Sequence, residues 1–333
     1  MEGKSTKQKV LEILEENSAR FISGQEIAEQ LYVTRNAVFK AVTALRSQGY
    51  EIEAVSHKGY RLCCKEDELS LGGIRKFLQM EDKEFKIEVY EELESTNDVA
   101  RQHAVSEPGK EMVVIADSQR AGRGRRGRYF HSPKGMGIYL SFAIFPKIGI
   151  EKAALITCMA AVALTRAIEK ETGIETGIKW VNDIYLNNKK IAGILTEGVT
   201  SLEDGILSHV VVGIGLNIYE SKEGFPEELK KVAGALLSKG AAIPEIRNRL
   251  CASIIKEFME LYHAKNPKEF MEEYREKSFL VGKCVKINPS DPETMGHKYA
   301  YVTGIDDMAR LLIRYEDGQV DSLFTGEVSV VEY

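Results

Sequence analysis

The sequence has 333 residues, of which 44% are hydrophobic and 29% charged, and its formal net charge is −5 at pH 7. This balance is typical of a globular protein, and the length predicts two or three domains. The longest uncharged stretch in a helical pattern, residues 153–165, is too short for the roughly 20 residues that cross a bilayer. Five cysteines form no CxxC pair, and the N-terminus has no secretory pattern. We therefore expect a cytoplasmic protein with no membrane partner.

Three helices are predicted near the N-terminus. Residues 7–16 place apolar side chains on one helical face. Ser23 and Glu26 fit a capping box ahead of a second helix, in which Glu26 reaches back to the cap. Thr34 can cap a third helix, which Gly49 ends.

Residues 51–62 then alternate around a turn at 57–59, as the strands of a hairpin do. The whole pattern resembles the winged helix-turn-helix domain of bacterial repressors, and residues 32–65 carry six basic and two acidic residues, a local charge of +4. That resemblance predicts DNA binding, although a small helical domain used for protein contacts is an alternative. The residues expected to contact DNA are Arg35, Asn36 and Lys40 on the third helix and Lys58 and Arg61 in the hairpin.

After a short charged connector at residues 66–69, strands and helices mix along the chain. The expected strands are residues 87–90, 112–116, 137–144, 179–180, 191–195 and 210–215. The expected helices are residues 152–171, 244–263 and 267–277. The chain then returns to short strands, expected at residues 285–287, 299–303, 311–315 and 320–324, with a turn at 316–318. The fold class is therefore α+β, in three domains: residues 1–66, 67–278 and 279–333, the last a small β-barrel.

Residues 122–128 read Gly-Arg-Gly-Arg-Arg-Gly-Arg, with four arginines in seven positions. The run satisfies GxGxxG, but a dinucleotide-binding loop opens a helix, and residues 129–135 with Pro133 are poor helix material. Guanidinium groups bind phosphate or carboxylate in bidentate fashion, and they repel one another unless an anion lies among them. We expect a loop that is mobile when empty and ordered by an anionic ligand. Taken alone, the run could also be a nucleic-acid patch or a basic linker.

Five further motifs accompany this loop in order along the chain. They are Glu-Ser-Thr-Asn-Asp at 94–98, Asp-Ser-Gln-Arg-Ala at 117–121, Lys-Trp-Val-Asn-Asp at 179–183, Lys-Lys-Ile-Ala-Gly-Ile-Leu at 189–195 and Gly-Ile-Gly-Leu-Asn at 213–217. The set strongly resembles the biotin protein ligase family, and with the winged helix it resembles the bifunctional bacterial form that also represses the biotin operon. The resemblance implies a central mixed α/β domain of the biotin/lipoate ligase type and a C-terminal SH3-like β-barrel.

This resemblance implies the activity of a biotin–[acetyl-CoA-carboxylase] ligase. Biotin and ATP, with Mg²⁺, would form biotinyl-5'-AMP, and biotin would then pass to a lysine of the biotin carboxyl carrier protein. The first step brings a carboxylate against an α-phosphate, so cations must offset two negative groups. We expect Lys190 to bridge both groups and Arg125 to act with it. Asp183 would either orient Lys190 or help to hold Mg²⁺.

The resemblance also assigns ligand contacts. The expected biotin-binding residues are Ser95, Thr96, Asn97, Gln119, Arg123, Gly124, Arg125 and Lys190. The expected nucleotide-binding residues are Arg128, Phe130, Lys179, Asn182 and Asn217. Ser95–Asn97 could also cap a helix, and we expect that run to serve both purposes. Trp180 could pack under the biotin tail or in the core. The family often has a tryptophan after the arginine loop, and here Phe130 would have to take its place on adenine.

Family behaviour implies a switch: biotinyl-AMP orders the arginine loop and favours a homodimer that binds the biotin operator, with biotinyl-AMP as corepressor. Three alternatives stay open. The chain could be a biotin-responsive regulator without catalysis, a lipoate or octanoate ligase of related fold, or an active ligase whose first domain does not bind DNA.

Overall fold

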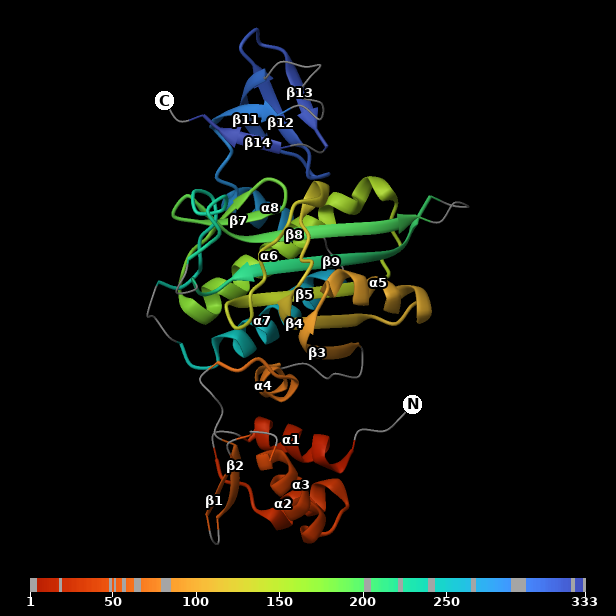
Figure 1. The fold of residues 1–333 in the computed structure, drawn as a ribbon. Helices are drawn as coiled ribbons and strands as arrows, with labels where there is room; N and C mark the ends of the chain where they lie inside the picture. The colour runs from red at the N-terminus through yellow and green to blue at the C-terminus, as the bar shows by residue number, and fades with distance from the viewer. Residues whose placement is uncertain are drawn as a thin grey trace. The chain divides into compact units, whose positions relative to one another are not determined.

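The computed structural model describes residues 5–17, 20–47, 50, 52–55, 58–62, 67–78, 85–200, 205–220, 224–238, 243–264, 268–288, 298–324 and 327–331. The chain divides into two compact units, one of Met1–Met80 with Ala242–Ser253, the other of Glu81–Ala241 with Ile254–Tyr333 (Figure 1). The domain borders expected after residues 66 and 278 stay predictions. No helix among the described residues is long and apolar enough to cross a membrane.

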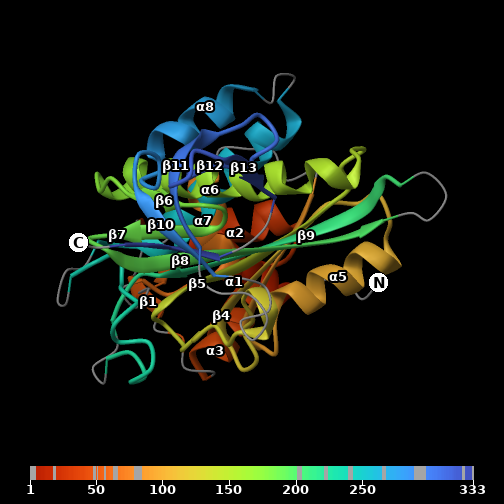
Figure 2. The same ribbon diagram turned by 90° about the horizontal axis from the view of Figure 1, so that it is seen from above.

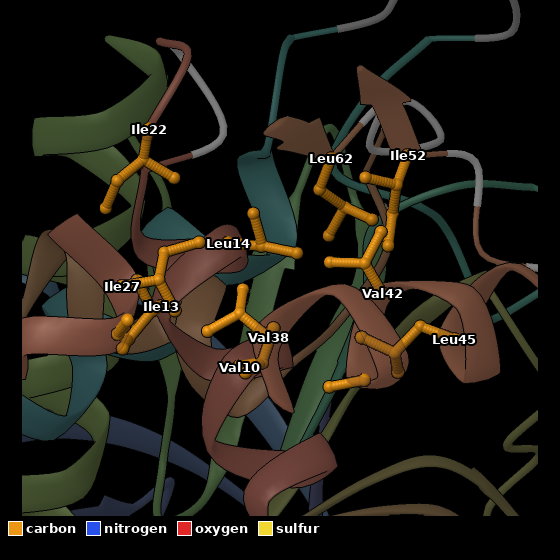
Figure 3. Close-up of a cluster of buried hydrophobic side chains, with 12 residues drawn as sticks. Val10, Ile13, Leu14, Ile22, Ile27, Val38, Val42, Leu45, Ile52 and Leu62 are labelled. Atoms are coloured by element: carbon orange, nitrogen blue, oxygen red, sulfur yellow. The ribbon is translucent and has the colours of Figure 1, made fainter. Parts of the chain in front are cut away.

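The first unit has the elements of a winged helix-turn-helix in the expected order. They are α1 (Thr6–Glu16), α2 (Gly24–Leu31), α3 (Arg35–Ser47), β1 (Ile52–Val55) and β2 (Gly59–Leu62). The two strands pair antiparallel, and the predicted residues Gly49, Glu51 and His57 lie outside the described part of the chain. Apolar side chains from all three helices and both strands form one buried cluster (Figure 3). The heptad-like spacing of Val38, Val42 and Leu45 therefore marks the face of α3 that packs inward.

Two of the predicted helix caps are present, one of them incompletely. Ser23 Oγ accepts a hydrogen bond from the Glu26 amide at 3.0 Å. The expected return bond from Glu26 is wrong, because its carboxylate binds Arg20 at 2.9 Å. Thr34 Oγ1 caps α3 by accepting from the Ala37 amide at 3.2 Å. Short polar side chains thus set the start of both helices, as their propensity for such positions predicts.

The connector at residues 66–69 is followed by a helix that the sequence did not predict, α4 (Leu71–Phe77). Ser70 caps it, and the Ser70 amide donates to Asn248 Oδ1 at 3.0 Å. Asn248 Nδ2 donates to the Glu68 carbonyl at 2.7 Å, and the buried Arg247 binds the Asp67 carbonyl at 2.7 Å. The described part of the connector is therefore anchored to the start of α7 (Ile246–His263); Glu66 lies outside the described residues.

Glu15 of α1 packs against α4, where a side chain on Gly72 would overlap its carboxylate. Burial raises the pKa of Glu15 to about 7, with the nearby Glu68, Glu12 and Glu16 adding to the effect and the Gly72 amide opposing it. Because the folded-state pKa lies above the unfolded value, the proton stabilises the fold at low pH, and this contribution is lost as the pH rises through about 7.

We therefore expect Glu15→Gln, which cannot ionise, to raise the thermal unfolding temperature by several degrees at pH 8. The difference should shrink toward pH 5, where the wild-type carboxyl is protonated. Differential scanning fluorimetry of the full chain from pH 5 to 8 measures this, with the exposed Glu29→Gln on α2 as control. Parallel curves for the wild type and Glu15→Gln would contradict the assignment.

A seven-stranded sheet organises the second unit. Its order is β3-β4-β5-β9-β8-β7-β6, with β3 and β4 parallel and the other neighbours antiparallel. The strands are β3 (Lys86–Leu93), β4 (Met112–Gln119), β5 (Gly137–Ile144), β6 (Gly177–Lys179), β7 (Asp183–Leu186), β8 (Lys189–Thr200) and β9 (Leu207–Asn217). Helix α5 (Thr96–Ser106) covers one face and α6 (Ala153–Thr172) the other (Figure 2).

Most of the predicted elements of this unit are present. All six expected strands occur, although β6 ends at Lys179 and leaves Trp180 in a turn. The short strand β7 was not predicted. The expected helices occur as α6, α7 and α8 (Lys268–Lys277), while the expected start of α8 at Pro267 lies outside the described residues.

The C-terminal strands form a separate antiparallel sheet in the order β13-β12-β11-β10-β14. The strands are β10 (Cys284–Asn288), β11 (Lys298–Ile305), β12 (Leu311–Tyr315), β13 (Val320–Leu323) and β14 (Glu327–Val330). The predicted turn at 316–318 joins β12 to β13, with Gly318 at φ 87°. The four predicted strands occur, and β14 is an additional one. Closure into an SH3-like barrel is consistent with this order and stays a prediction.

Candidate functional site

A cavity of about 370 Å³ in the second unit collects the sequence motifs. Every residue that the sequence assigned to biotin, to the nucleotide or to catalysis lines it. These are Ser95, Thr96, Asn97, Gln119, Arg123, Gly124, Arg125, Arg128, Phe130, Lys179, Asn182, Asp183, Lys190 and Asn217. A cavity of this size is in the range of small-molecule sites. The individual roles of these lining residues stay predictions.

The arginine loop is a tight reversal and not the start of an α-helix. The Phe130 amide donates to the Gly122 carbonyl at 2.9 Å, and the Gly124 amide donates to the Arg128 carbonyl at 2.7 Å. One 3₁₀ turn closes the tip, where Arg126 has φ 56°. At Gly122, a Cβ would lie 2.6 Å from the Phe130 carbonyl oxygen, so the reversal requires glycine there. The dinucleotide-binding geometry is thereby excluded, as the sequence predicted.

Two of the loop arginines contact side chains of other elements. Arg123 forms an ion pair with Asp98 of α5, and Arg125 donates to Asn182 Oδ1 at 3.1 Å. Asp98 also pairs with Arg101 at 3.0 Å. The sequence did not predict Asp98 as a partner of the loop, because nothing in its local pattern points to a residue 25 positions away. Whether an anion orders this loop stays a prediction.

The polar wall of the cavity begins at α5. Ser95 stands at the N-cap position of α5, as expected for this run, but its side chain makes no capping hydrogen bond. The Thr96 amide donates to Gln119 Oε1 at 2.9 Å, and Gln119 Nε2 donates to Ser132 Oγ at 3.1 Å. Ser95, Thr96 and Asn97 are each no more than 5% exposed. This corner therefore offers buried hydroxyl and amide groups, which suit recognition of an uncharged polar ring.

Lys190 and Asp183 face each other from adjacent strands. The Lys190 ammonium lies 2.7 Å from Asp183 Oδ1. The Lys190 backbone is held as well, since its amide donates to the Val232 carbonyl at 2.8 Å and its carbonyl accepts from Gly234 at 2.9 Å. Among the described residues that line the cavity, Asp183 carries the only carboxylate. The geometry favours the first of its two expected roles, in which it orients Lys190.

Two ionisable rings in the wall are neutral near pH 7. Burial lowers the pKa of His131, against a weaker opposite effect of Glu228. Burial, with a contribution from the nearby Asp183, raises the pKa of Tyr185 to about 12. Lys179 lies over the Tyr185 ring at 5.5 Å. The fixed charge around the cavity is therefore predominantly positive, which favours an anionic ligand.

Two aromatic side chains of the cavity wall, Phe130 and Trp180, are held by neighbouring backbone. A Cβ at Gly215 would lie 2.5 Å from the Phe130 ring, so the ring lies directly on the backbone of β9. Trp180 is 4% exposed and donates from Nε1 to the Ala309 carbonyl at 2.8 Å, beside the C-terminal sheet. Trp180 therefore serves the core and also lines the cavity.

Two of the expected nucleotide ligands also support the cavity wall. Asn182 Nδ2 donates to the Ile194 carbonyl at 2.9 Å, and Asn217 Nδ2 donates to the Gly234 carbonyl at 3.1 Å.

Several lining residues were not predicted. They include Phe225, Leu229, Val232, Ala233, Val328 and Ser329. They come from irregular chain and from the short strand β14, where sequence patterns carry little information.

The predicted DNA contacts lie in the first unit. Arg35, Asn36 and Lys40 are exposed on α3, and Lys58 is exposed in the hairpin. Arg61 is less available than expected. Its guanidinium binds Glu53 at 2.6 Å and lies 4.7 Å over the Phe21 ring.

Two exposed aromatic residues on the same helix-turn-helix were missed. Phe39 of α3 is 57% exposed, and Tyr32, which ends α2 in the left-handed conformation, is 97% exposed. Exposed aromatic side chains beside exposed basic residues are suited to contact with a partner.

Each of the two units contains a region that matches a known protein family. Residues 89–217 match the biotin/lipoate A/B protein ligase family, and residues 6–61 match an HTH domain. The bifunctional ligase/repressor BirA of Bacillus subtilis is 35% identical over 326 residues, which cover 96% of this chain and 97% of that protein. BirA of Escherichia coli is 28% identical over 316 residues and 94% of each chain.

Among solved structures, the biotin protein ligase of Aquifex aeolicus in complex with biotin and ATP matches with a TM-score of 0.59 and 26% identity. It covers 74% of this chain and 99% of that one. From its two family matches, its near full-length relatives and the residues gathered in its cavity, the chain belongs to the bifunctional ligase/repressor family of biotin protein ligases.

Proposed function

We infer that the protein is an ATP-dependent biotin–[acetyl-CoA-carboxylase] ligase and a transcriptional repressor of the biotin operon. One observation carries the ligase assignment. Arg123, Arg125 and Lys190 line one cavity, although they come from a loop and a strand that are far apart in the sequence, and the polar side chains of Thr96 and Gln119 line it too. Cations together with neutral hydrogen-bonding groups suit an acyl-adenylate of biotin.

The first step joins biotin to AMP. A carboxylate oxygen of biotin attacks the α-phosphorus of ATP, a P–O bond forms, and pyrophosphate leaves with the electron pair of the bond that breaks. Lys190, held by Asp183, would neutralise both the carboxylate and the α-phosphate. Arg125 adds a second cation from the loop, and its bond to Asn182 fixes its direction.

The second step transfers the acyl group to the carrier. The amine of a lysine on the biotin carboxyl carrier protein attacks the acyl carbon of biotinyl-5'-AMP. An amide bond forms, AMP leaves, and the amine loses a proton. The enzyme contributes position and charge, and no covalent enzyme intermediate is needed.

Mg²⁺ is suited to this chemistry because it would bind the phosphates of ATP. Such ions are commonly held by one or two carboxylates together with substrate oxygens. Asp183 is the one cavity carboxylate of the described residues, so it could contribute a single ligand, and the remaining ligands would come from ATP and water. The ion would supply charge to the phosphates, while Lys190 and the loop arginines act on the carboxylate and α-phosphate.

The direct test is incubation of the protein with biotin, Mg-ATP and a biotin carboxyl carrier domain, followed by intact mass of the carrier. The expected result is one biotinyl group per carrier domain, dependent on ATP. A carrier of unchanged mass would reject the ligase and leave a biotin-responsive regulator. Parallel reactions with lipoate or octanoate and a lipoyl domain test the related acyl ligases, which we expect to be inactive.

Arg125→Ala should weaken retention of the intermediate. Without the guanidinium in the cavity wall, biotinyl-5'-AMP would lose a charge-assisted bond worth roughly 1.5–3 kcal/mol, so its dissociation should speed up by about tenfold to a hundredfold. Adenylate released into solution, quantified by mass spectrometry, measures this. Arg126→Ala is the control, because Arg126 lies at the loop tip and does not line the cavity in the described structure.

The repressor function rests on the first unit. Biotinyl-5'-AMP would act as corepressor by ordering the cavity loops and favouring a homodimer, which places two copies of α3 on a two-fold related operator. Unbiotinylated carrier would consume the adenylate and keep the protein monomeric. Operator affinity measured with and without biotin plus ATP tests this coupling. Equal affinity in both conditions would remove the switch.

A further inference from the structure

We propose that Phe39 of α3 is a specificity-determining residue that reads thymine in the operator, through contact between its ring and the C5 methyl group of the base. The proposal rests on the repressor function and deepens it, because it names a base that the DNA-binding face recognises. The place of the ring on the exposed face of α3 carries this inference.

The Phe39 side chain lies outside the buried core of the helix-turn-helix domain. The core side chains of α3 are those of Val38, Ala41, Val42 and Leu45. Phe39, in contrast, is 57% exposed. A ring that stays mostly in water gains little free energy from folding, so its removal should leave the domain folded.

The exposed residues of α3 form one face, and Phe39 lies within it. Successive residues of an α-helix are turned by about 100° around its axis. Counted from Arg35, Phe39 therefore lies about 40° around the axis and Thr43 about 80°. Lys40 lies about 140° around on the same count, and all four side chains are exposed. The phenyl ring is thus placed between two cations, near the middle of the face.

The middle of this face offers no hydrogen-bond donor. The Phe39 ring has no polar atom, and the Thr43 hydroxyl donates to the Phe39 carbonyl at 2.9 Å, so its proton is already used. Neither side chain can therefore donate to the N7 and O6 acceptors that mark guanine in the major groove. The apolar feature of that groove is the C5 methyl group of thymine, which a phenyl ring can contact.

The charge around the ring identifies DNA as the partner of this face. Arg35 and Lys40 flank Phe39 with positive charge, which attracts the phosphates of DNA. The sequence of α3 contains no aspartate or glutamate that would oppose this attraction. A recognition helix meets the base edges with residues of its N-terminal part, and Phe39 is the fifth residue of α3. The ring is therefore in a position along the helix that suits contact with a base.

The test replaces thymine by deoxyuridine in the operator, which removes the C5 methyl group and keeps the hydrogen-bonding groups of the base. One thymine position is changed at a time, symmetrically in both half-sites. Fluorescence anisotropy with the full-length protein, biotin and Mg-ATP gives the Kd of each duplex. For the wild type, at least one position should raise the Kd by about tenfold, because the dimer loses two methyl contacts. Phe39→Ala should bind that duplex and the unmodified one with Kd values within about twofold of each other.

Tyr32→Ala is the matched control. Tyr32 is also an exposed aromatic residue, but it ends α2 and lies outside α3. This variant should keep the wild-type loss at every thymine position, whatever its overall affinity. Phe39→Leu retains an apolar side chain and should keep part of the loss, and it replaces Phe39→Ala should that variant not show the thermal transition of the wild type in circular dichroism.

Equal losses in the wild type and in folded Phe39→Ala at every thymine position would overturn the proposal. If Phe39→Ala also bound the unmodified operator as tightly as the wild type, the ring would be assigned to a protein partner instead. Failure of the wild type to prefer the operator over an unrelated duplex would reject the repressor function on which the proposal rests.

Discussion

Lys190→Ala is expected to slow formation of biotinyl-5'-AMP by on the order of a thousandfold or more while the fold survives. The ammonium is the cation placed against Asp183 at 2.7 Å inside the cavity. Its loss leaves the carboxylate and the α-phosphate to repel each other in a site of reduced dielectric. Biotin-dependent exchange of pyrophosphate into ATP measures this step alone.

Lys170→Ala serves as the matched control, since this lysine is half exposed on α6 and pairs loosely with Glu257 at 4.0 Å. Its exchange rate should equal that of the wild type. Circular dichroism should give the same thermal transition for both variants. Near-normal exchange in Lys190→Ala would remove Lys190 from the centre of the mechanism, and the arginine loop would have to carry the charge instead.

The double change Arg35→Ala with Lys40→Ala should weaken operator binding by at least a hundredfold at physiological salt and leave ligation intact. Both side chains are exposed on α3. One is expected to reach base edges and the other a phosphate, and each such interaction contributes roughly 1–3 kcal/mol. Fluorescence anisotropy with biotin and ATP present measures the affinity. A salt titration should give a slope that is smaller by about one for each phosphate that the variant no longer neutralises.

Lys9→Ala, a charge removed from the exposed face of α1, is the control for this pair. It should alter operator affinity only slightly. Simultaneous loss of ligation in the double variant would argue against independent activities. An unchanged affinity would leave an active ligase whose first unit does not bind DNA.

The sequence predicted the cavity better than it predicted the contacts around it. The polar motifs lie at strand ends and at the start of α5, where the chain order of a mixed sheet brings them together. By contrast, Glu197 and Ser141 meet Asn97 over separations of 100 and 44 residues. No local spacing encodes a pairing of that length, and a lone glutamate or serine in a strand has no motif of its own.

The missed helix α4 has a similar cause. Its sequence begins Leu-Gly-Gly-Ile, and two glycines disfavour a helix. The structure requires glycine there, because a Cβ at Gly73 would lie 2.5 Å from the Asn248 side chain. Close approach of a distant helix therefore overrides the local preference. β7 and β14 are two further short strands that the sequence did not predict.

The placement of β14 bears on how the protein should be handled. Val328 and Ser329 belong to the cavity wall, although they lie more than a hundred positions after the last motif residue, Asn217. Shortened versions that stop before Glu327 would accordingly lack part of the cavity wall and should not serve as minimal ligases. Affinity tags and fluorescent fusions are better joined at the N-terminus than directly after β14.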